Sequence, residues 1–252
     1  MTSNPRTAIL IAAAIFLAAP AIAPAQAQTF SSDQRREIES IVKGYLLEHP
    51  ELLHDIMVEL DKRQQAEEAE KHRAAVAENN ATLFRSPHQV VLGNPQGDVT
   101  MVEFFDYNCG FCKRAMSDML DLLKTNPNLK FVLKEFPVLG EGSVEAAHVA
   151  VAVRMQDITG KKYIEFHQKL LGGRGPADKA RALAVAKEVG FDVARIEKDM
   201  GSDEVKKTID ENMKLADALG VTGTPSYVVG DEVVVGAVGI DALREKLAAE
   251  HK

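Results

Sequence analysis

The sequence has 252 residues, and its 30 lysines and arginines stand against 37 aspartates and glutamates, which leaves a net charge of -7. This acidic balance gives no support for nucleic acid or an anionic lipid surface as a partner. The length suits one well-packed domain with an accessory segment. Beyond the first 27 residues no stretch is apolar enough to cross a membrane, and the only cysteines are Cys109 and Cys112.

The N-terminal stretch, residues 1–27, is predicted to be a cleaved signal peptide. Arg6 supplies a positive charge, residues 8–19 are apolar without interruption, and residues 25–27 form an A-x-A cleavage site. The apolar run is too short to span a bilayer, which takes about 18–20 residues; a retained N-terminal anchor is the alternative. Removing this stretch leaves 29 basic and 37 acidic residues, a net charge of -8. The mature chain, starting at Gln28, is therefore expected in an exported compartment where disulfides form and persist.

Residues 31–84 have a helical pattern with two apolar stripes. Ser31 and Gln34 have the spacing of a capping box. His49-Pro50 is expected to end the first helix, because the residue before a proline is pushed away from helical angles, and Pro50 suits the first turn of the next helix. The stripes recur at helical spacing: Ile38, Ile41, Val42, Tyr45 and Leu46 on the first helix, and Leu52, Leu53, Ile56, Met57 and Leu60 on the second.

After Asp61 the second helix becomes polar. Charged residues, glutamine and alanine dominate up to about Asn79, so this part favours a helix but has little to bury. A helix from Pro50 to Asn79 would be roughly 45 Å long at 1.5 Å per residue, too long to pack wholly on a domain of this size. The stripes either pack on the core of the same chain or drive self-association, and the polar spacer favours self-association. We assign residues 28–85 to a helical oligomerisation arm and linker, and this pattern does not separate dimer from trimer.

Residues 86–252 predict a mixed α/β domain. Apolar runs and turn residues indicate strands at 88–92, 99–105, 129–136, 226–229 and 233–235. Helical patterns cover 111–124, a long block at about 143–219 interrupted by glycines, and a closing segment from Asp241. The order is therefore two strands, a helix, a strand, a block of helices, a hairpin and a helix.

The two cysteines lie where a buried strand passes into a helix. Residues 106–110 break the apolar run of the strand, and a helix is predicted from Phe111. A thiolate on Cys109 would lie beside unpaired backbone N–H groups at the positive end of the helix dipole. In C-x-x-C motifs such surroundings lower a cysteine pKa from about 8.5 to roughly 3.5–7.5. We therefore predict a redox dithiol, with Cys109 as nucleophile and Cys112 as resolving cysteine.

Two other uses of the cysteines agree less well with the sequence. A plain structural disulfide would close so short a loop that it would stabilise the fold by only about 2 kcal/mol, against about 3 kcal/mol for a fifteen-residue loop. A structural zinc site normally needs four ligands, and no second cysteine pair exists. Redox chemistry agrees with the motif, its strand–helix context and the export signal.

The motif Cys109-Gly110-Phe111-Cys112, together with Glu103 and with Thr224-Pro225 before the hairpin, resembles the thioredoxin fold with a helical insertion found in DsbA-like disulfide oxidoreductases. The resemblance implies a catalytic domain at 86–252 with an insertion at about 143–220. The leader and the helical segment at 31–84 also resemble the periplasmic ScsC-type members, whose N-terminal helices assemble trimers and which can act as disulfide isomerases.

This resemblance implies roles for further residues. Glu103 would be a buried acid beneath the thiols that helps to move the Cys112 proton, unless it points to solvent; Lys134 on the next strand is a candidate partner for it. Pro225 is expected to follow a cis peptide bond and to present Thr224 backbone groups to an extended substrate, although an ordinary trans proline is the alternative. Phe111 either offers an apolar patch to unfolded substrates or merely packs.

The seven histidines are expected to be surface or packing residues, and none is assigned a role. No cofactor, metal or nucleic acid is expected. Between the two cysteines, Gly110-Phe111 carries no cation, so by comparison with a strongly oxidising member with histidine there we expect a weaker oxidant.

The predicted function is that of a periplasmic thiol–disulfide oxidoreductase that isomerises or reduces non-native disulfides. Its expected partners are unfolded or disulfide-containing secreted proteins, a membrane redox partner that recycles the dithiol, and further copies of the chain, with the resemblance favouring a trimer. The alternatives are a monomeric dithiol oxidase and a non-enzymatic holdase or Cu(I)-binding protein, since soft thiolates suit Cu(I).

Overall fold

The computed structural model describes residues 30–250, so the signal peptide predicted at 1–27 lies outside the described residues. The chain divides into two compact units, one ending at Val58 and one beginning at Glu59. The domain boundary predicted after residue 85 stays a prediction. Within the part of the chain that the structure describes, no helix is both long and apolar enough to cross a membrane.

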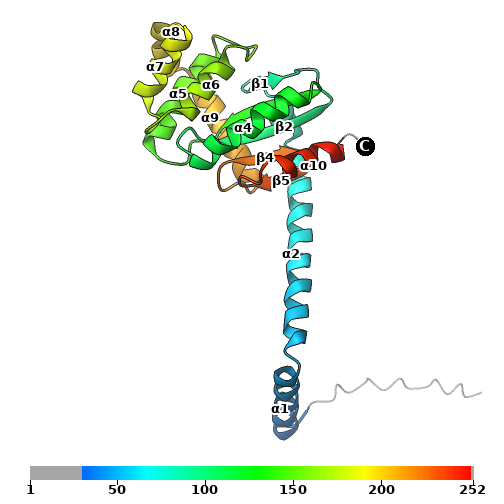
Figure 1. Cartoon of the computed structure of the whole chain (residues 1–252). Coiled ribbons are helices and arrows are strands. Elements are labelled where there is room, and N and C mark those ends of the chain that lie inside the picture. Colours follow the sequence, from blue (N-terminus) through cyan, green and yellow to red (C-terminus); the bar gives the residue numbers. More distant parts are fainter. Residues whose placement is uncertain (1–29, 251–252) are drawn as a thin grey trace, which may run out of the picture. The chain divides into compact units, whose positions relative to one another are not determined.

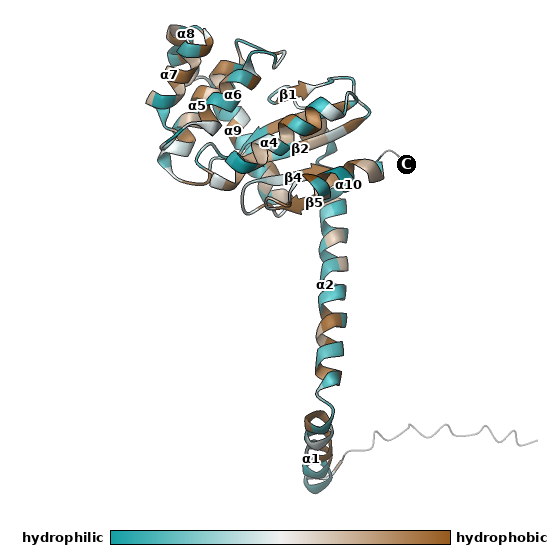
Figure 2. Cartoon of the chain, in the orientation of Figure 1, coloured by the Kyte–Doolittle hydropathy of each residue, from teal (hydrophilic) through white to brown (hydrophobic). Residues whose placement is uncertain are grey.

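The first unit contains α1 (Ser32–Glu48) and the beginning of α2 (Glu51–Glu78). The predicted capping box is present: the Ser31 side chain accepts a hydrogen bond from Gln34 N at 3.2 Å, and the Gln34 side chain accepts one from Ser31 N at 2.9 Å. The break between the two helices falls at His49-Pro50, as predicted. No residue of α1 is buried, although the hydropathy colouring of Figure 2 marks apolar residues along this helix.

The second unit is built on a five-stranded sheet with the order β1-β3-β2-β4-β5 (Figure 1). Strands β2 and β3 run parallel, and the other neighbouring pairs are antiparallel. A parallel pair needs a crossover connection, which α4 (Gly110–Thr125) supplies. The strands are β1 (Val90–Gly93), β2 (Val99–Phe105), β3 (Leu129–Glu135), β4 (Ser226–Val229) and β5 (Glu232–Val235).

Helices cover both faces of this sheet, because successive strand side chains point to opposite faces and both sets are apolar. On one face Met101, Phe105 and Phe131 share a core with Met119 of α4 and Leu247 of the closing helix α10. On the other face a second core contains residues of β2, β3 and β4 with residues of α3 and α9: Val102, Phe104, Val132, Val228, Leu83 and Leu215. The bounds of these helices are α3 (Asn80–Arg85), α9 (Asp203–Ala218) and α10 (Ile240–Glu250).

A block of five helices separates β3 from β4, where the sequence predicts an insertion at about 143–220. Besides α9 it consists of α5 (Glu141–Arg154), α6 (Tyr163–Gly172), α7 (Lys179–Val189) and α8 (Val193–Asp199). The thioredoxin fold with a helical insertion, preceded by an N-terminal helical segment, is therefore confirmed.

Helix α3 is fastened to the sheet by two lysines of β3. Lys130 Nζ donates a hydrogen bond to Phe84 O at 2.6 Å, and Lys134 Nζ donates one to Thr82 O at 2.8 Å. Leu83, between the two carbonyls, is fully buried. Carbonyls in the last turn of a helix have no partner within the helix, so the lysines satisfy groups that would otherwise be buried without one.

Candidate active site

Cys109 occupies the N-cap position of α4, at the end of the turn that follows β2. Its Sγ accepts a hydrogen bond from Cys112 N at 3.2 Å, as N-cap side chains do. The side chain is 5% exposed, whereas Cys112 is fully buried, and both cysteines are free thiols. The predicted strand–turn–helix placement of the pair is confirmed. Only the first sulfur faces the helix tip, where backbone N–H groups and the dipole favour a negative charge.

The loop before β4 closes over Cys109 from the far end of the sequence. The Thr224–Pro225 peptide bond is cis. The Cys109 thiol donates a hydrogen bond to Thr224 O at 3.2 Å, although 115 residues separate the two. Ser226 Oγ donates to Gly223 O at 2.8 Å and holds the turn. The structure thus brings the Thr224-Pro225 turn to Cys109 Sγ.

Glu103 lies inside the protein, so the alternative that it points to solvent is wrong. It is 3% exposed and stands opposite Tyr227 in the β2–β4 ladder. Burial raises the pKa of Glu103 from 4.5 to about 8; the negative charge of Asp118 adds to this shift and a hydrogen bond with Tyr227 opposes it. A carboxyl group with this pKa exchanges its proton near neutral pH.

Glu103 also acts on the buried cysteine. Burial raises the pKa of Cys112, and the negative charge of Glu103 is the second cause of that shift. The two groups therefore lie within electrostatic reach of each other. The charge of Glu103 favours the protonated form of Cys112, so the protonation states of the two groups are coupled.

Lys134 does not pair with Glu103, and that expectation is wrong. In the parallel β2–β3 ladder Glu103 is level with Leu133, and Phe104 is level with Lys134. Because the side-chain period of a strand is two, Lys134 lies on the opposite face of the sheet from Glu103. Its ammonium group instead donates to Thr82 O and lies 3.8 Å from Glu211 Oε1.

Sequence patterns did not single out Asp106, the first of three residues that hold the turn carrying Cys109 against its surroundings. This aspartate is 1% exposed. Its Oδ2 accepts hydrogen bonds from Val138 N at 2.9 Å and Leu139 N at 3.0 Å, and its Oδ1 accepts one from Ser143 Oγ at 2.7 Å. Its backbone oxygen accepts from Cys109 N at 3.0 Å. One buried carboxylate therefore ties the nucleophile's turn to the start of the insertion.

Asn108 forms a second clamp. Its amide nitrogen donates to Ala177 O at 2.8 Å and to Ser143 Oγ at 3.0 Å, while its amide oxygen accepts from Ala177 N at 2.7 Å. The side chain thus pairs with both backbone groups of Ala177, as a neighbouring strand would. The sequence marked Asn108 only as a residue that ends the strand, since its partners lie 35 and 69 residues away.

Tyr107, between these two residues, reaches into the insertion. Its hydroxyl lies 3.1 Å from Tyr163 Oη and 3.3 Å from His167 Nδ1, and Tyr163 donates to Glu135 Oε1 at 2.9 Å. All four side chains are buried. Burial lowers the pKa of His167 to about 3, so this histidine is a neutral packing residue, in keeping with the sequence-based expectation.

Phe111 is 57% exposed, so it does not pack into the core. The Arg114 guanidinium lies 4.3 Å from the centroid of its ring. Two further apolar side chains near the catalytic turn, Val138 and Leu139, are 40% and 53% exposed. Because Asp106 binds the backbone of these two residues, the turn that carries Cys109 and this apolar loop are held together.

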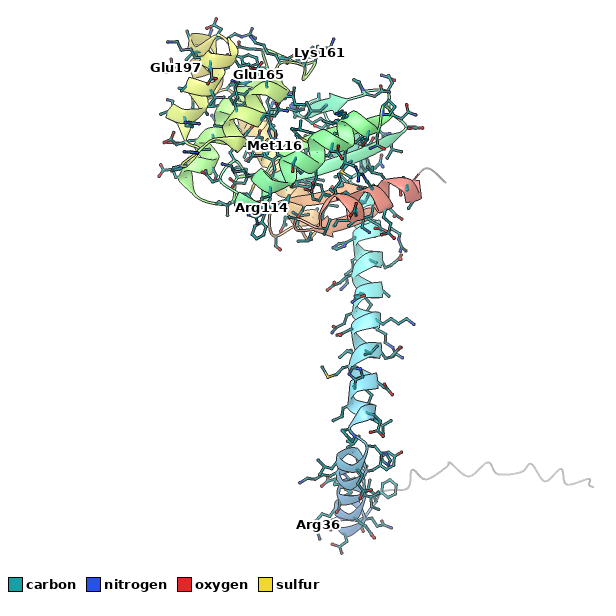
Figure 3. The ribbon with its side chains drawn as sticks, in the orientation of Figure 1. Arg36, Arg114, Met116, Lys161, Glu165 and Glu197 are labelled. Atoms are coloured by element: carbon teal, nitrogen blue, oxygen red, sulfur yellow. The ribbon has the colours of Figure 1, made fainter. Side chains whose placement is uncertain are left out.

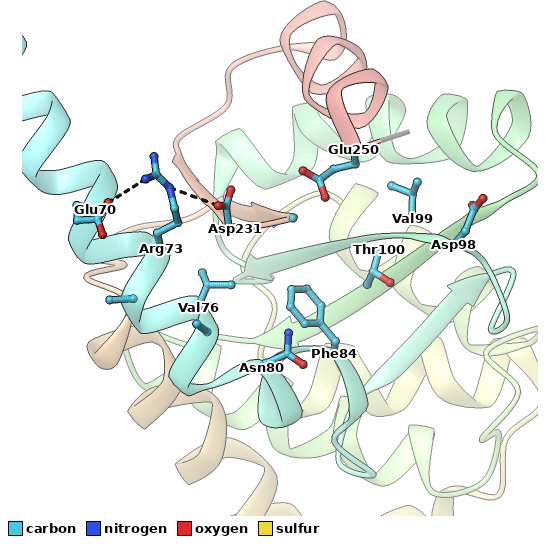
Figure 4. Close-up of a pocket in the computed structure, with 13 residues that line it drawn as sticks. Glu70, Arg73, Val76, Asn80, Phe84, Asp98, Val99, Thr100, Asp231 and Glu250 are labelled. Atoms are coloured by element: carbon cyan, nitrogen blue, oxygen red, sulfur yellow. Dashed lines mark hydrogen bonds and ion pairs between the residues drawn. The ribbon is translucent and has the colours of Figure 1, made fainter. Parts of the chain in front are cut away.

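A cavity of about 680 Å³ between α2, α3, the start of β2 and the β4–β5 turn contains none of the predicted site residues (Figure 4). At its rim Arg73 donates to Glu70 Oε2 at 2.8 Å and lies 3.3 Å from Asp231 Oδ2. Among the described residues, no group of three or more His, Cys, Asp or Glu side chains is arranged to hold a metal ion.

Residues 100–248 match the DSBA-like thioredoxin domain family, and residues 34–67 match the family described as copper resistance protein ScsC N-terminal domain. Among curated relatives, 155 residues are 26% identical to the Na(+)/H(+) antiporter NhaA 1 of Salinispora arenicola, and the match spans only 23% of the length of that protein.

Three solved structures match a larger part of this chain than that relative does. A thioredoxin-like oxidoreductase from Silicibacter pomeroyi is 44% identical, covering 69% of this chain and 98% of its own, with a TM-score of 0.65. The thiol-disulfide exchange protein alpha-DsbA2 from Wolbachia pipientis is 28% identical over 72% of this chain and 96% of its own, with a TM-score of 0.67. Proteus mirabilis ScsC in a transitional conformation is 26% identical over 88% of this chain and 98% of its own, with a TM-score of 0.64.

Proposed function

The chain belongs to the family of DSBA-like thioredoxin domains, and from this premise we propose that it is a thiol–disulfide oxidoreductase that isomerises or reduces non-native disulfides of exported proteins. The observation that carries the proposal is the position of Cys109 Sγ, at the tip of α4 between Cys112 N and Thr224 O. A sulfur in this position has a hydrogen-bond donor for its anionic form, Cys112 N, and faces a loop that can bind substrate.

The reaction begins when the Cys109 thiolate attacks one sulfur of a substrate disulfide. A new bond joins Cys109 to the substrate, and the second substrate sulfur leaves as a thiolate. In isomerisation another substrate thiolate attacks the mixed disulfide, so Cys109 is regenerated and no net electrons move. In reduction the Cys112 thiolate attacks Cys109 Sγ, so the dithiol becomes a disulfide and two electrons pass to the substrate.

Glu103 supports the second route by accepting the proton that Cys112 must lose. Both groups are buried, and the charge of Glu103 acts on Cys112. The pKa of about 8 at Glu103 keeps proton exchange possible near neutral pH. A carboxylate in water, with a pKa of about 4.3, would be a weaker base for this step.

Substrate would bind along the loop that contains the cis peptide bond. An extended peptide adding to the backbone at Thr224 places its own sulfur beside Cys109, because Thr224 O lies 3.2 Å from Cys109 Sγ. The exposed ring of Phe111 and the apolar side chains of Val138 and Leu139 add surface suited to unfolded chains.

The N-terminal unit is proposed to assemble the chain into a homo-oligomer, with a trimer favoured. A groove of about 430 Å³ on α1 and the start of α2 is lined mainly by apolar side chains, among them Val42, Leu46 and Leu53. No residue of α1 is buried. Burial of such a stripe against other copies removes apolar area from water. The match of residues 34–67 to the ScsC N-terminal domain supports this role.

The remaining parts of the proposal concern location and recycling. Export to the periplasm, with cleavage after Ala27, follows from the signal-peptide prediction. Isomerisation needs a reduced resting dithiol, so a membrane redox partner that supplies electrons is proposed. A monomeric oxidase would instead need a partner that removes them.

The decisive experiment is the reactivation of a scrambled disulfide protein by the reduced mature chain, together with the redox potential of the dithiol. Recovery of native activity without added oxidant supports isomerisation, and no recovery overturns it. Sedimentation of the mature chain with and without residues 28–79 tests the assembly: an oligomer that becomes monomeric on deletion is expected. A monomer in both cases would favour the oxidase.

Binding of Cu(I) by the two thiols is the second candidate function. It is favoured by the copper resistance protein description of the family that matches residues 34–67, and by the softness of thiolate ligands. This candidate predicts tight Cu(I) binding that is lost in Cys109→Ser, together with no reactivation of scrambled substrate.

A further inference from the structure

The first turns of α4 hold two exposed cations beside the nucleophile. Lys113 and Arg114 follow Cys109 by four and five residues, and both side chains are exposed. Figure 3 labels Arg114, whose guanidinium covers the ring of Phe111. Lys113 Nζ donates a hydrogen bond to Gly173 O and thereby ties α4 to the loop that follows α6.

The end of α6 and this loop, residues 172–175, bring further positive charge to the same place. Arg174 lies within it and is exposed. A Cβ added to Gly173 would lie 2.6 Å from Arg181 Nη2, so the absence of a side chain at Gly173 leaves room for the Arg181 guanidinium against the loop. A Cβ added to Gly172 would lie 3.3 Å from Met116 Cε, which confirms that the loop rests on α4.

These four cations, Lys113, Arg114, Arg174 and Arg181, form what we term the cationic rim. Within residues 30–250 none of them has a carboxylate within 4.0 Å. Three acidic side chains of the neighbouring helices have other partners: Glu145 accepts from Lys179 N, Asp178 caps α7, and Glu188 pairs with Lys169. The pKa of Glu188 is lowered mainly by Lys169, and the charge of Arg181 contributes last. The rim is thus a concentration of positive charge on a chain whose net charge is -7.

We propose that the cationic rim selects disulfide substrates whose reacting cysteine is flanked by acidic residues. The inference rests on the proposed thiol–disulfide exchange at Cys109 and names the substrate class that this exchange prefers. A rim of like charge beside a reactive group raises the local concentration of oppositely charged substrate and its association rate, and salt weakens this effect.

The geometry sets the position of the acidic residues in the substrate. Along a helix, four to five residues correspond to about 6–7.5 Å at 1.5 Å per residue. An extended peptide advances about 3.3 Å per residue. An acidic side chain two or three positions from the substrate cysteine therefore falls opposite Lys113 and Arg114.

The test compares three disulfide-bonded peptides that differ only two and three positions from the cysteine, where they carry glutamate, glutamine or lysine. Initial rates of reduction by the reduced mature protein are measured in stopped flow at about 20 mM and 500 mM salt. We expect the glutamate peptide to react about tenfold faster than the lysine peptide at low salt, and this ratio to approach one at high salt.

Two charge variants localise the effect. Arg174→Gln/Arg181→Gln should bring the glutamate-to-lysine ratio at low salt down several-fold, because it removes half of the rim without touching the thiol motif. Lys206→Gln/Lys207→Gln, two exposed positions on α9, changes the net charge equally and should leave the ratio unchanged. The initial rate with the uncharged glutamine peptide shows whether each variant is folded and retains its basal exchange activity.

The outcomes separate the two proposals. If the wild-type protein does not reduce the glutamine peptide, the proposed function fails. If it reduces that peptide but treats glutamate and lysine peptides alike at low salt, or if both charge variants lower the ratio equally, the selection by the rim is overturned. If the rim variant does not fold, the wild-type protein alone provides the test. A glutamate-to-lysine rate ratio that is high at low salt and approaches one at high salt supports selection by charge, and a ratio that salt does not change overturns it.

Discussion

The thiol of Cys109 and the carbonyl oxygen of Thr224 lie 3.2 Å apart and form a hydrogen bond, while Cys112 N donates to the same sulfur from the other side. A thiol can make both interactions, whereas a thiolate accepts only the bond from Cys112 N. Ionisation of Cys109 therefore releases Thr224 O for another donor. The backbone N–H of an extended substrate is such a donor, so activation of the nucleophile and opening of the substrate contact are linked.

Substitution of the two cysteines should have different consequences. Cys109→Ser is expected to remove exchange activity altogether, because the group at the tip of α4 is then no longer a thiolate. Cys112→Ser should keep the first attack but lose the reductive release, so mixed disulfides with substrate accumulate. Non-reducing electrophoresis with mass spectrometry detects them. Full refolding activity in Cys109→Ser, or trapping through Cys112 in that variant, would contradict the assignment.

The free energy of unfolding should depend on pH through Glu103. Burial raises the pKa of this acid from 4.5 to about 8, so between these values the native protein holds a proton that the unfolded chain has released. Stability contributed by this group therefore falls as pH rises through that window. Glu103→Gln removes the titration, and its loss of stability from pH 5 to pH 8 should be smaller than that of the wild type by a few kcal/mol.

Urea unfolding at the two pH values measures this difference, with Glu197→Gln, an exposed position on α8, as the matched control. The control should follow the wild type. A pH dependence of Glu103→Gln identical to that of the wild type would show that the carboxyl group is not the titrating site. The same variant should also slow the reductive release through Cys112 without slowing the first attack by Cys109.

Loss of the Asn108 clamp should destabilise the fold and disturb the catalytic turn. Asn108→Ala removes hydrogen bonds to Ala177 and Ser143 and leaves partly buried backbone groups of Ala177 without a partner. We expect a decrease of roughly 2–3 kcal/mol in the free energy of unfolding and slower exchange. Thermal and denaturant unfolding provide the measurement.

Ser117→Ala is the control for this change. The Ser117 hydroxyl also donates to a backbone oxygen, Arg114 O, but this hydrogen bond lies on the exposed side of α4. Its effect should stay within about 0.5 kcal/mol. If Asn108→Ala were equally mild, Asn108 would not be the element that holds the turn against the insertion.

Substitution of Phe111 should weaken the binding of large unfolded substrates and leave exchange with short peptides unchanged. Its ring is 57% exposed, so Phe111→Ser is expected to change the free energy of unfolding by no more than about 0.5 kcal/mol. Loss of an apolar contact with an unfolded chain should raise the KM for scrambled proteins by up to about tenfold, which corresponds to about 1.4 kcal/mol. Exchange with a short peptide disulfide should be unchanged. An equal effect on both substrates would instead assign the residue to the reactivity of the thiol.

Much of the architecture follows from patterns that are local in the sequence. The turn residues between β2 and α4, the position of Cys109 at the helix tip, the Ser31–Gln34 capping box and the break at His49-Pro50 all depend on neighbours within a few positions. Backbone preferences and capping act over that range, so the sequence is sufficient to predict them. The mixed α/β class also follows, because apolar residues recur at different periods in strands and helices. The thioredoxin fold itself rests on the resemblance carried by the Cys109-Gly110-Phe111-Cys112 motif, Glu103 and Thr224-Pro225.

What only the tertiary structure decided are the contacts between distant segments. Side chains alternate between the two faces of a strand, so Lys134 and Glu103 lie on opposite faces of the sheet in the observed register of β2 and β3. That register is set by the packing of the whole sheet. The distant hydrogen-bond partners of Asp106, Asn108 and Thr224 lie 32 to 115 residues away, and no local preference selects them. Hydrogen bonds of this kind form only when collapse of the core brings the chains together and excludes water. The sequence by itself therefore singled out the cysteine pair and its place at a helix tip, and the folded chain determined what surrounds the two sulfurs.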